Sequence, residues 1–214
     1  MEIGNHEPEE AEPRADGPGP TDPDGSELAV SAFVRFGLYF YGAMIAVALV
    51  WRMGLYDESI LFSSPAAESA GANPLREVAI GIAVGLAVVL ASEIATRLTG
   101  WGDALARELA AAIGPISVPN ALLLAMASGL GEELFFRGAL QPRVGLLLAS
   151  LAFGAMHFVP RREMWPWTGF ALVVGLLFGA LFEWTGSVIA PVVAHTVVNG
   201  INLPLLVRRH GPAH

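Results

Sequence analysis

Residues 117–139 read SVPNALLLAMASGLGEELFFRGA, an apolar stretch that contains two adjacent glutamates, Glu132 and Glu133, and Arg137. A helix needs about 20 mostly apolar residues to cross the hydrocarbon region of a bilayer. An ionisable side chain near the bilayer centre costs about 2.5–3.5 kcal/mol on insertion scales, so such residues persist when they have partners or a function. The stretch therefore predicts a membrane helix that carries a polar site.

The composition of the whole chain agrees with a membrane location. Of its 214 residues, 54% are hydrophobic and 15% are charged, against roughly 25% charged residues in ordinary soluble domains. Six apolar stretches are long enough for membrane helices and too uniformly apolar for barrel strands: 29–51, 77–97, 117–139, 143–159, 166–184 and 187–207. The predicted fold is all-α, a polytopic membrane bundle of about six transmembrane helices.

The remaining segments divide the chain into four parts. Residues 1–27 are rich in proline and glycine and contain nine acidic residues and one arginine, which account for the formal charge of −8. Such a segment has too little apolar surface to offset the entropy of ordering, so a disordered acidic tail is expected. Residues 28–116 are expected to hold the first helices and their loops, 117–207 the core with the site, and 208–214 a short C-terminal tail.

Arginine supplies all 12 basic residues, and its distribution predicts the orientation. If both termini are cytoplasmic, the positive-inside rule is met. Six arginines then lie inside (Arg97, Arg107, Arg161, Arg162, Arg208 and Arg209) and three outside (Arg52, Arg76 and Arg143). The connection 98–116, with charged residues between apolar ones, is expected to form an amphipathic interfacial helix.

Several classes of protein are disfavoured by what the sequence lacks. The arginines form no basic stripe, so nucleic acid is not an expected partner. The absence of cysteine excludes disulfides, thiolate metal sites and a cysteine nucleophile. The first residues lack the basic start and apolar core of a signal peptide, so the first apolar helix is expected to direct insertion.

Helical spacing assigns different surroundings to the two adjacent glutamates. Positions four apart share a helix face, so Glu133 is expected to pair with Arg137, whereas Glu132 points about 100° away. Alone, such a group near a helix end is more often a structural ion pair than a functional site.

Two further stretches each carry a histidine and a same-face neighbour. His157 follows Phe153 by four residues, and His195 precedes Asn199 by four. A single histidine in a membrane helix often only bonds to a neighbouring helix. Two histidines, an asparagine and a free glutamate on three predicted spans favour a hydrolytic site.

The chemistry of these groups permits two assignments, both left open. In one, Glu132 takes a proton from water with help from a histidine, while His195 and Asn199 donate hydrogen bonds to the oxyanion formed at a peptide carbonyl. In the other, Glu132, His157 and His195 bind a divalent metal such as zinc, which activates the water.

Three short motifs together resemble the CPBP family of intramembrane proteases, also called the CAAX protease or Abi family. They are EExxxR (Glu132 to Arg137), FxxxH (Phe153 to His157) and HxxxN (His195 to Asn199), within about residues 120–205. The family includes eukaryotic endopeptidases that remove the last three residues of prenylated CAAX proteins. It also includes prokaryotic members linked to bacteriocin immunity or to cleavage of other membrane partners.

The resemblance implies a role for each motif residue. Glu132 and His157 would activate the water, His195 and Asn199 would hold the oxyanion, and Glu133 with Arg137 would support the site. The expected enzyme is an endopeptidase, glutamate-type or metal-dependent, in a prokaryotic cytoplasmic membrane. Its substrate would be a membrane-embedded or membrane-associated peptide or protein, prenylated or not.

Two alternatives compete with this interpretation. Tyr56-Asp57 and Gly100-Trp101-Gly102-Asp103 match the YD and GxGD pairs of presenilin-like aspartyl proteases, although both aspartates fall in polar connections. A non-enzymatic membrane protein is also possible, with the polar cluster binding a partner, serving an immunity function, or conducting protons or a solute.

One geometric condition can be stated in advance. If the third and fourth helices form a hairpin that turns near Pro142, Glu132 and His157 differ in depth by about 9 Å. A tilted helix or a displaced turn must bring them level.

Overall fold

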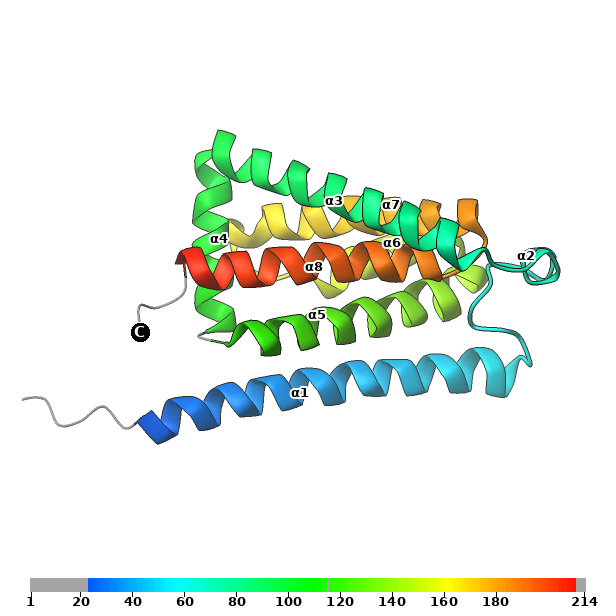
Figure 1. Ribbon diagram of the computed structural model, residues 1–214, viewed down its shortest axis with the longest axis horizontal. Helices are drawn as coiled ribbons and strands as arrows, with labels where there is room; N and C mark the ends of the chain where they lie inside the picture. Colours follow the sequence, from blue (N-terminus) through cyan, green and yellow to red (C-terminus); the bar gives the residue numbers. More distant parts are fainter. Residues whose placement is uncertain (1–22, 115, 211–214) are drawn as a thin grey trace, which may run out of the picture.

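The computed structural model describes residues 23–114 and 116–210, whose regular structure is helical apart from an isolated antiparallel bridge between Phe62 and Ser187 (Figure 1). The α-helices in these residues are α1 (Pro23–Leu49), α2 (Pro65–Ala70), α3 (Pro74–Leu98), α4 (Gly100–Ile113), α5 (Val118–Glu133), α6 (Gln141–Met156), α7 (Trp165–Thr185) and α8 (Ile189–His210). Two π-helical turns, η1 (Val50–Leu55) and η2 (Leu134–Leu140), follow α1 and α5, and a 3₁₀ turn, η3 (Arg162–Met164), precedes α7. The all-α prediction is confirmed for the described residues.

The helices begin where local capping allows. At the start of α3, Asn73 accepts a hydrogen bond from the N–H of Arg76 at 3.1 Å, and Glu77 accepts one from the N–H of Asn73 at 3.1 Å. This reciprocal box satisfies two free donors of the first turn. α1 begins at Pro23, so helix extends into the segment 1–27 for which disorder is expected. Residues 1–22 and 211–214 lie outside the described part of the chain.

Five helical segments in the described residues are long and apolar enough to cross a membrane: Ala32–Leu55, Pro74–Leu98, Val118–Met156, Arg162–Thr185 and Ile189–Arg209. The predicted count of six is not confirmed, because 117–139 and 143–159 fall largely in one segment of 39 residues. Large apolar side chains remain exposed on these segments, for example Phe36 (68%) and Leu90 (61%), as expected of a surface that faces lipid.

The 39-residue segment changes direction at Gly145, where φ is 82° and ψ is 167°. His157 returns to within 3.8 Å of Glu132, whereas a straight helix would hold the two residues roughly 38 Å apart. The turn lies three residues beyond Pro142. Glu132 is therefore 13 residues before the turn, and His157 is 12 residues after it. The displaced turn therefore removes the expected difference in depth.

The arm of α6 beyond this turn is too short to cross a bilayer alone. Residues 146–156 extend roughly 16 Å, about half of a hydrocarbon region that is ~30 Å thick. The predicted span 143–159 is therefore corrected to a half-length arm that ends at the candidate site.

Replacing Gly145 by alanine is expected to lower the free energy of unfolding by about 1–3 kcal/mol, because this backbone conformation is largely restricted to glycine. Thermal unfolding in detergent, followed by tryptophan fluorescence, measures the change. Gly42→Ala is the matched control, since an added Cβ meets no atom within 4 Å at either position and φ is positive only at Gly145. Equal stability of the two variants would contradict the assigned strain.

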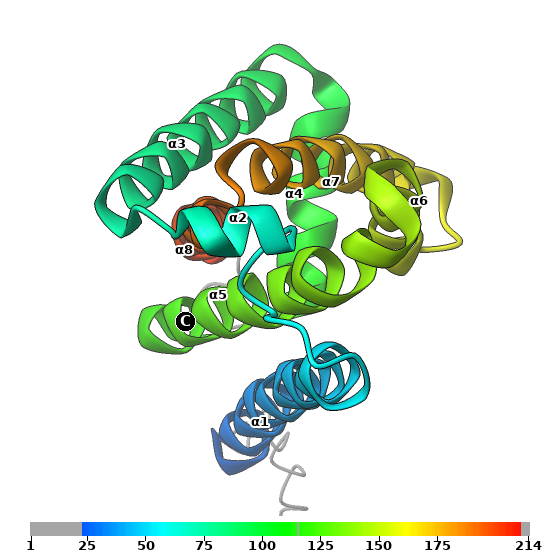
Figure 2. The same cartoon turned by 90° about the vertical axis from the view of Figure 1, so that its right-hand side faces the viewer.

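α8 lies between α3 and α5, and glycines permit this close packing (Figure 2). A Cβ at Gly85 of α3 would lie 2.8 Å from the carbonyl oxygen of Ala194. A Cβ at Gly129 of α5 would lie 2.5 Å from Oγ1 of Thr196. Small residues let membrane helices approach closely. Here the glycines allow α3 and α5 to pack against the part of α8 that carries His195.

The two groups of arginines predicted from the sequence gather at opposite ends of the bundle. Arg52 and Arg143 both pair with Glu58, at 2.9 and 2.7 Å. Arg97 and Arg209 both pair with Glu93, at 2.7 and 2.8 Å. The start of α1 and the end of α8 lie at the Glu93 end (Figure 1).

α4 is the helix expected in the connection 98–116, and it runs across the Glu93 end of the bundle (Figure 1). It carries Asp103, whereas Asp57 follows η1 at the opposite end. An aspartyl protease needs its two aspartates to face each other. The presenilin-like interpretation is therefore wrong.

Candidate active site

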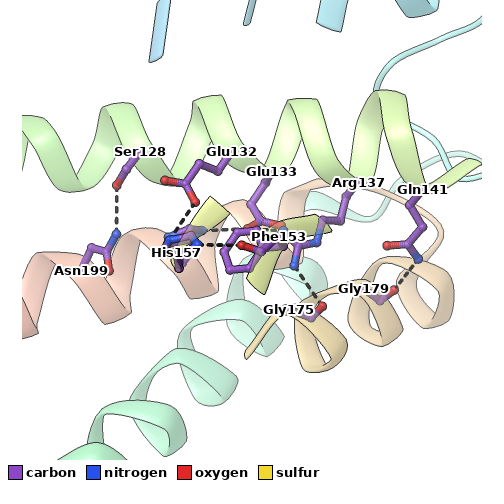
Figure 3. Close-up of polar contacts among 11 residues, drawn as sticks. Ser128, Glu132, Glu133, Arg137, Gln141, Phe153, His157, Gly175, Gly179 and Asn199 are labelled. Atoms are coloured by element: carbon purple, nitrogen blue, oxygen red, sulfur yellow. Dashed lines mark hydrogen bonds and ion pairs between the residues drawn. The ribbon is translucent and has the colours of Figure 1, made fainter. Parts of the chain in front are cut away.

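The four residues given catalytic roles in the sequence analysis line one cavity of about 580 Å³. Glu132 lies in the last turn of α5, His157 directly follows α6, and His195 and Asn199 lie one turn apart on α8. Figure 3 shows how these elements bring the side chains together. The supporting pair, Glu133 and Arg137, does not line the cavity; its side chains are 0% and 1% exposed.

Glu132 and His157 face each other without a direct hydrogen bond. Their nearest atoms, Oε2 and Nε2, are 3.8 Å apart, and Oε2 has no hydrogen-bond partner among the described residues. Nδ1 of His157 lies 2.8 Å from the carbonyl oxygen of Phe153. A carbonyl can only accept, so Nδ1 carries a proton and Nε2 of the neutral ring is an acceptor.

The two hydrogen-bond acceptors, 3.8 Å apart, are placed so that one water molecule can bridge them. A water has two protons to donate, one to the Glu132 carboxylate and one to Nε2 of His157. Its oxygen lone pairs then remain free to attack. The geometry fits water activation by a carboxylate and an imidazole better than a simple ion pair.

The buried carboxylate of Glu133 contacts two side chains. Its Oε1 accepts from Nη1 of Arg137 at 3.1 Å and lies 2.7 Å from Nδ1 of His195. The pairing with Arg137 was predicted from the i,i+4 spacing, but the contact with His195 was not. A carboxylate on Nδ1 fixes the orientation of the ring and leaves Nε2 as its free nitrogen.

Arg137 is anchored in turn to α7. Its Nη2 donates to the carbonyl oxygen of Gly175 at 2.9 Å, and its guanidinium lies 4.6 Å from the centre of the Phe153 ring. One turn later, Nε2 of Gln141 donates to the carbonyl oxygen of Gly179 at 3.0 Å (Figure 3). These contacts tie η2 and the start of α6 to α7, and so stabilise the charged group behind the cavity.

Phe153 also packs against both histidines. Its ring centre is 4.6 Å from that of His157 and 6.1 Å from that of His195. One residue of the FxxxH motif thus provides a carbonyl for one imidazole and an aromatic wall for both.

Asn199 is oriented by Ser128, which was not identified from the sequence. Nδ2 of Asn199 donates to Oγ of Ser128 at 2.9 Å, and that hydroxyl donates to the carbonyl oxygen of Ala125 at 3.2 Å. Because the hydroxyl proton is engaged, Ser128 presents only lone pairs to the amide. Position 128 is four residues before Glu132 on the same helix face, a spacing that could have identified it.

The sequence left open a metal held by Glu132, His157 and His195. Glu133 occupies Nδ1 of His195, so Nε2 is the nitrogen of that ring left to bind an ion. Across residues 23–114 and 116–210, no group of three His, Cys, Asp or Glu side chains is arranged to hold an ion. We therefore derive no step through a metal.

These features define the class of protein: a polytopic, all-α integral membrane protein in which ionisable side chains line a cavity between the helices. Residues 114–201 match the family model for Rce1-like proteins, described as type II CAAX prenyl endopeptidase Rce1-like. The match supports, for this part of the chain, the resemblance to the CPBP, or CAAX protease, family that the three motifs indicated.

A relative with a similar sequence is the uncharacterized protein YpbD of Bacillus subtilis (strain 168). It is 37% identical over 87 residues, which are 40% of this chain and 44% of YpbD. The chain thus spans less than half the length of that relative. No solved structure matches the chain significantly.

Proposed function

We propose that this protein is an intramembrane endopeptidase that hydrolyses a peptide bond of a membrane-associated protein or peptide. The observation that carries the proposal is the 3.8 Å separation of two acceptors, Glu132 Oε2 and His157 Nε2, on a cavity shared with His195 and Asn199. The match of residues 114–201 to the Rce1-like family model supports the same reaction class.

The first step is attack by water. Glu132 acts as the general base and takes one proton, while His157 accepts the second hydrogen bond and orients the molecule. The water oxygen adds to the carbonyl carbon of the substrate, and the carbonyl oxygen becomes an oxyanion. When the C–N bond then breaks, the proton on Glu132 passes to the departing amine.

The oxyanion is held by Asn199 and His195. One N–H of the Asn199 amide is used by Ser128, so the second is available to the substrate. For His195, Nε2 can donate only if the ring is protonated on both nitrogens. An imidazolium there brings Glu132, Glu133, Arg137 and His195 to a net charge of zero, which favours their shared burial.

Replacing Ser128 by alanine is expected to lower kcat about tenfold with little change in KM, because the Asn199 amide loses the bond that fixes its orientation. Ser150→Ala is the matched control, since Ser150 is also buried and its hydroxyl has no partner among the described residues. Steady-state kinetics of both variants measure the effect. Equal kcat values would exclude this role for Ser128.

The substrate is proposed to enter along the apolar part of the cavity. Its lining includes Phe33, Phe36 and Phe40 of α1 and Trp101 and Leu105 of α4. Such walls accept a lipid chain or an apolar peptide segment. Two internally quenched peptides separate these cases: one ends in a farnesylated CAAX sequence, and the other has the same sequence without the lipid.

The protein is proposed to lie in a prokaryotic cytoplasmic membrane with both termini in the cytoplasm. The Glu93 end, which holds Arg97, Arg107, Arg161 and Arg209 together with the start of α1 and the end of α8, would then face inward, as the positive-inside rule favours.

A comparison of membrane proteomes tests the function directly. Cells expressing the wild-type chain should contain new protein termini that are absent from cells expressing His157→Gln at the same level. Identical sets of termini would reject the peptidase. The competing transport function predicts instead a proton flux in liposomes that depends on His157 and needs no peptide.

A further inference from the structure

Glu132 has a neighbour on a helix that lies outside the family match. Tyr41 belongs to α1, and its phenol lies near the Glu132 carboxylate. Tyr41 lines the same cavity as Glu132 and His157. The described residues place no hydrogen-bond donor on Oε2, the oxygen that faces His157.

Gly131 brings α1 to this position. A Cβ at Gly131 would lie 3.0 Å from Cβ of Tyr41 and 3.2 Å from its carbonyl oxygen. The backbones of α1 and α5 therefore approach each other one residue away from Glu132. Phe40 packs edge-on against Tyr41, with ring centres 5.4 Å apart, and restricts the direction of the phenol.

We infer that Tyr41 is a positioning residue for Glu132, with its hydroxyl on one carboxylate oxygen so that Oε2 is left for the water and His157. The role deepens the proposed function and depends on it. It also makes the site incomplete without α1, although α1 lies outside the family match at residues 114–201.

The physical effect is on the ionised form of the carboxylate. A hydrogen bond to a carboxylate favours its charged state, which a general base must have before it accepts a proton. Glu132 also interacts electrostatically with Arg137 and His195, whose charges remain when the hydroxyl is removed. Tyr41→Phe therefore isolates the hydroxyl, since it keeps the ring and its packing.

A substrate-free experiment tests the contact. Dicyclohexylcarbodiimide reacts with protonated carboxyl groups in apolar surroundings, and mass spectrometry reports the labelling of Glu132. In the full-length protein in detergent, Tyr41→Phe should raise the labelling rate at Glu132 about tenfold. Tyr39→Phe is the matched control, because Tyr39 is 77% exposed. Equal rates in Tyr41→Phe and wild type would overturn the inference.

Cleavage of the two quenched peptides separates this inference from the proposed function. Tyr41→Phe should lower kcat about tenfold with KM within about twofold and an unchanged unfolding temperature. In a Gly131→Ala background, where α1 is displaced, the same substitution should have a smaller effect. If Glu132→Gln abolishes cleavage while Tyr41→Phe cuts like wild type, Tyr41 has no positioning role. If Glu132→Gln still cuts, the proposed function itself fails.

Discussion

Replacing Glu132 by glutamine is expected to lower kcat by about 10²- to 10⁴-fold while the protein still folds and binds substrate. Glutamine preserves the size of the side chain but cannot take a proton from water, and general-base catalysis typically contributes a factor of this size. Because Oε2 has no protein hydrogen-bond partner among the described residues, little stability should be lost. Single-turnover cleavage of the quenched peptides measures the change.

The matched control for this variant is Glu183→Gln. Glu183 lies on α7, accepts a hydrogen bond from Gln141 at 3.0 Å and does not line the cavity. Its replacement should leave kcat within about twofold of wild type. Cleavage by Glu132→Gln at the wild-type rate would reject the water-activation mechanism.

Replacing Arg137 by methionine is expected to lower the free energy of unfolding by about 3–5 kcal/mol, because it leaves the buried group of Glu132, Glu133 and His195 with one uncompensated negative charge. Such a loss corresponds to a fall in the unfolding temperature of about 6–20 °C for a chain of this size. Activity should fall as well, since Glu133 orients His195. Thermal unfolding in detergent and peptide cleavage measure the two effects.

The matched control for Arg137→Met is Arg107→Met, which changes a second ion pair with the same i,i+4 spacing. Arg107 pairs with Asp103 on α4, where the two side chains are 59% and 45% exposed. Exposed pairs contribute about 0–1 kcal/mol, so Arg107→Met should be nearly neutral. A double variant with Glu133→Gln and Arg137→Met should recover part of the lost stability, because no buried charge is left unpaired. Equal effects of Arg107→Met and Arg137→Met would show that burial does not determine the cost.

The polar residues of the site were identifiable from the sequence because the membrane makes them costly. Glu132, His157, His195 and Asn199 interrupt apolar runs, and their i,i+4 neighbours follow from helix geometry. That spacing predicted the contact between Glu133 and Arg137, which lie on consecutive turns of one helical segment. The roles of these residues remain proposals.

Contacts between helices were not predictable in the same way. Periodicity places Glu133 and His195 on their own helices but does not show that these helices meet, so the 2.7 Å contact was missed. The same holds for the bond between Ser128 and Asn199 and for the contact inferred between Tyr41 and Glu132. Each of these contacts requires two helices to pack closely. The glycines that permit such packing carry no polar group, so they do not stand out in an apolar sequence.

The hairpin turns at Gly145, three residues beyond Pro142, near which the sequence analysis considered a turn. Proline disrupts helix interiors but is tolerated in the first turn of a helix, and Pro142 occupies that place in α6. The reversal instead needs a positive φ, which only Gly145 in this region provides among the described residues.

The nearly equal arms of the hairpin make the site sensitive to chain length. One residue inserted between Glu132 and Gly145, or between Gly145 and His157, would rotate one reactive group by about 100° and move it about 1.5 Å along its helix. Substitutions of the lipid-facing apolar residues along these arms change only local packing, whereas insertions and deletions misalign the two groups. The hairpin should therefore tolerate a new side chain on its lipid-facing surface better than a change in the length of either arm.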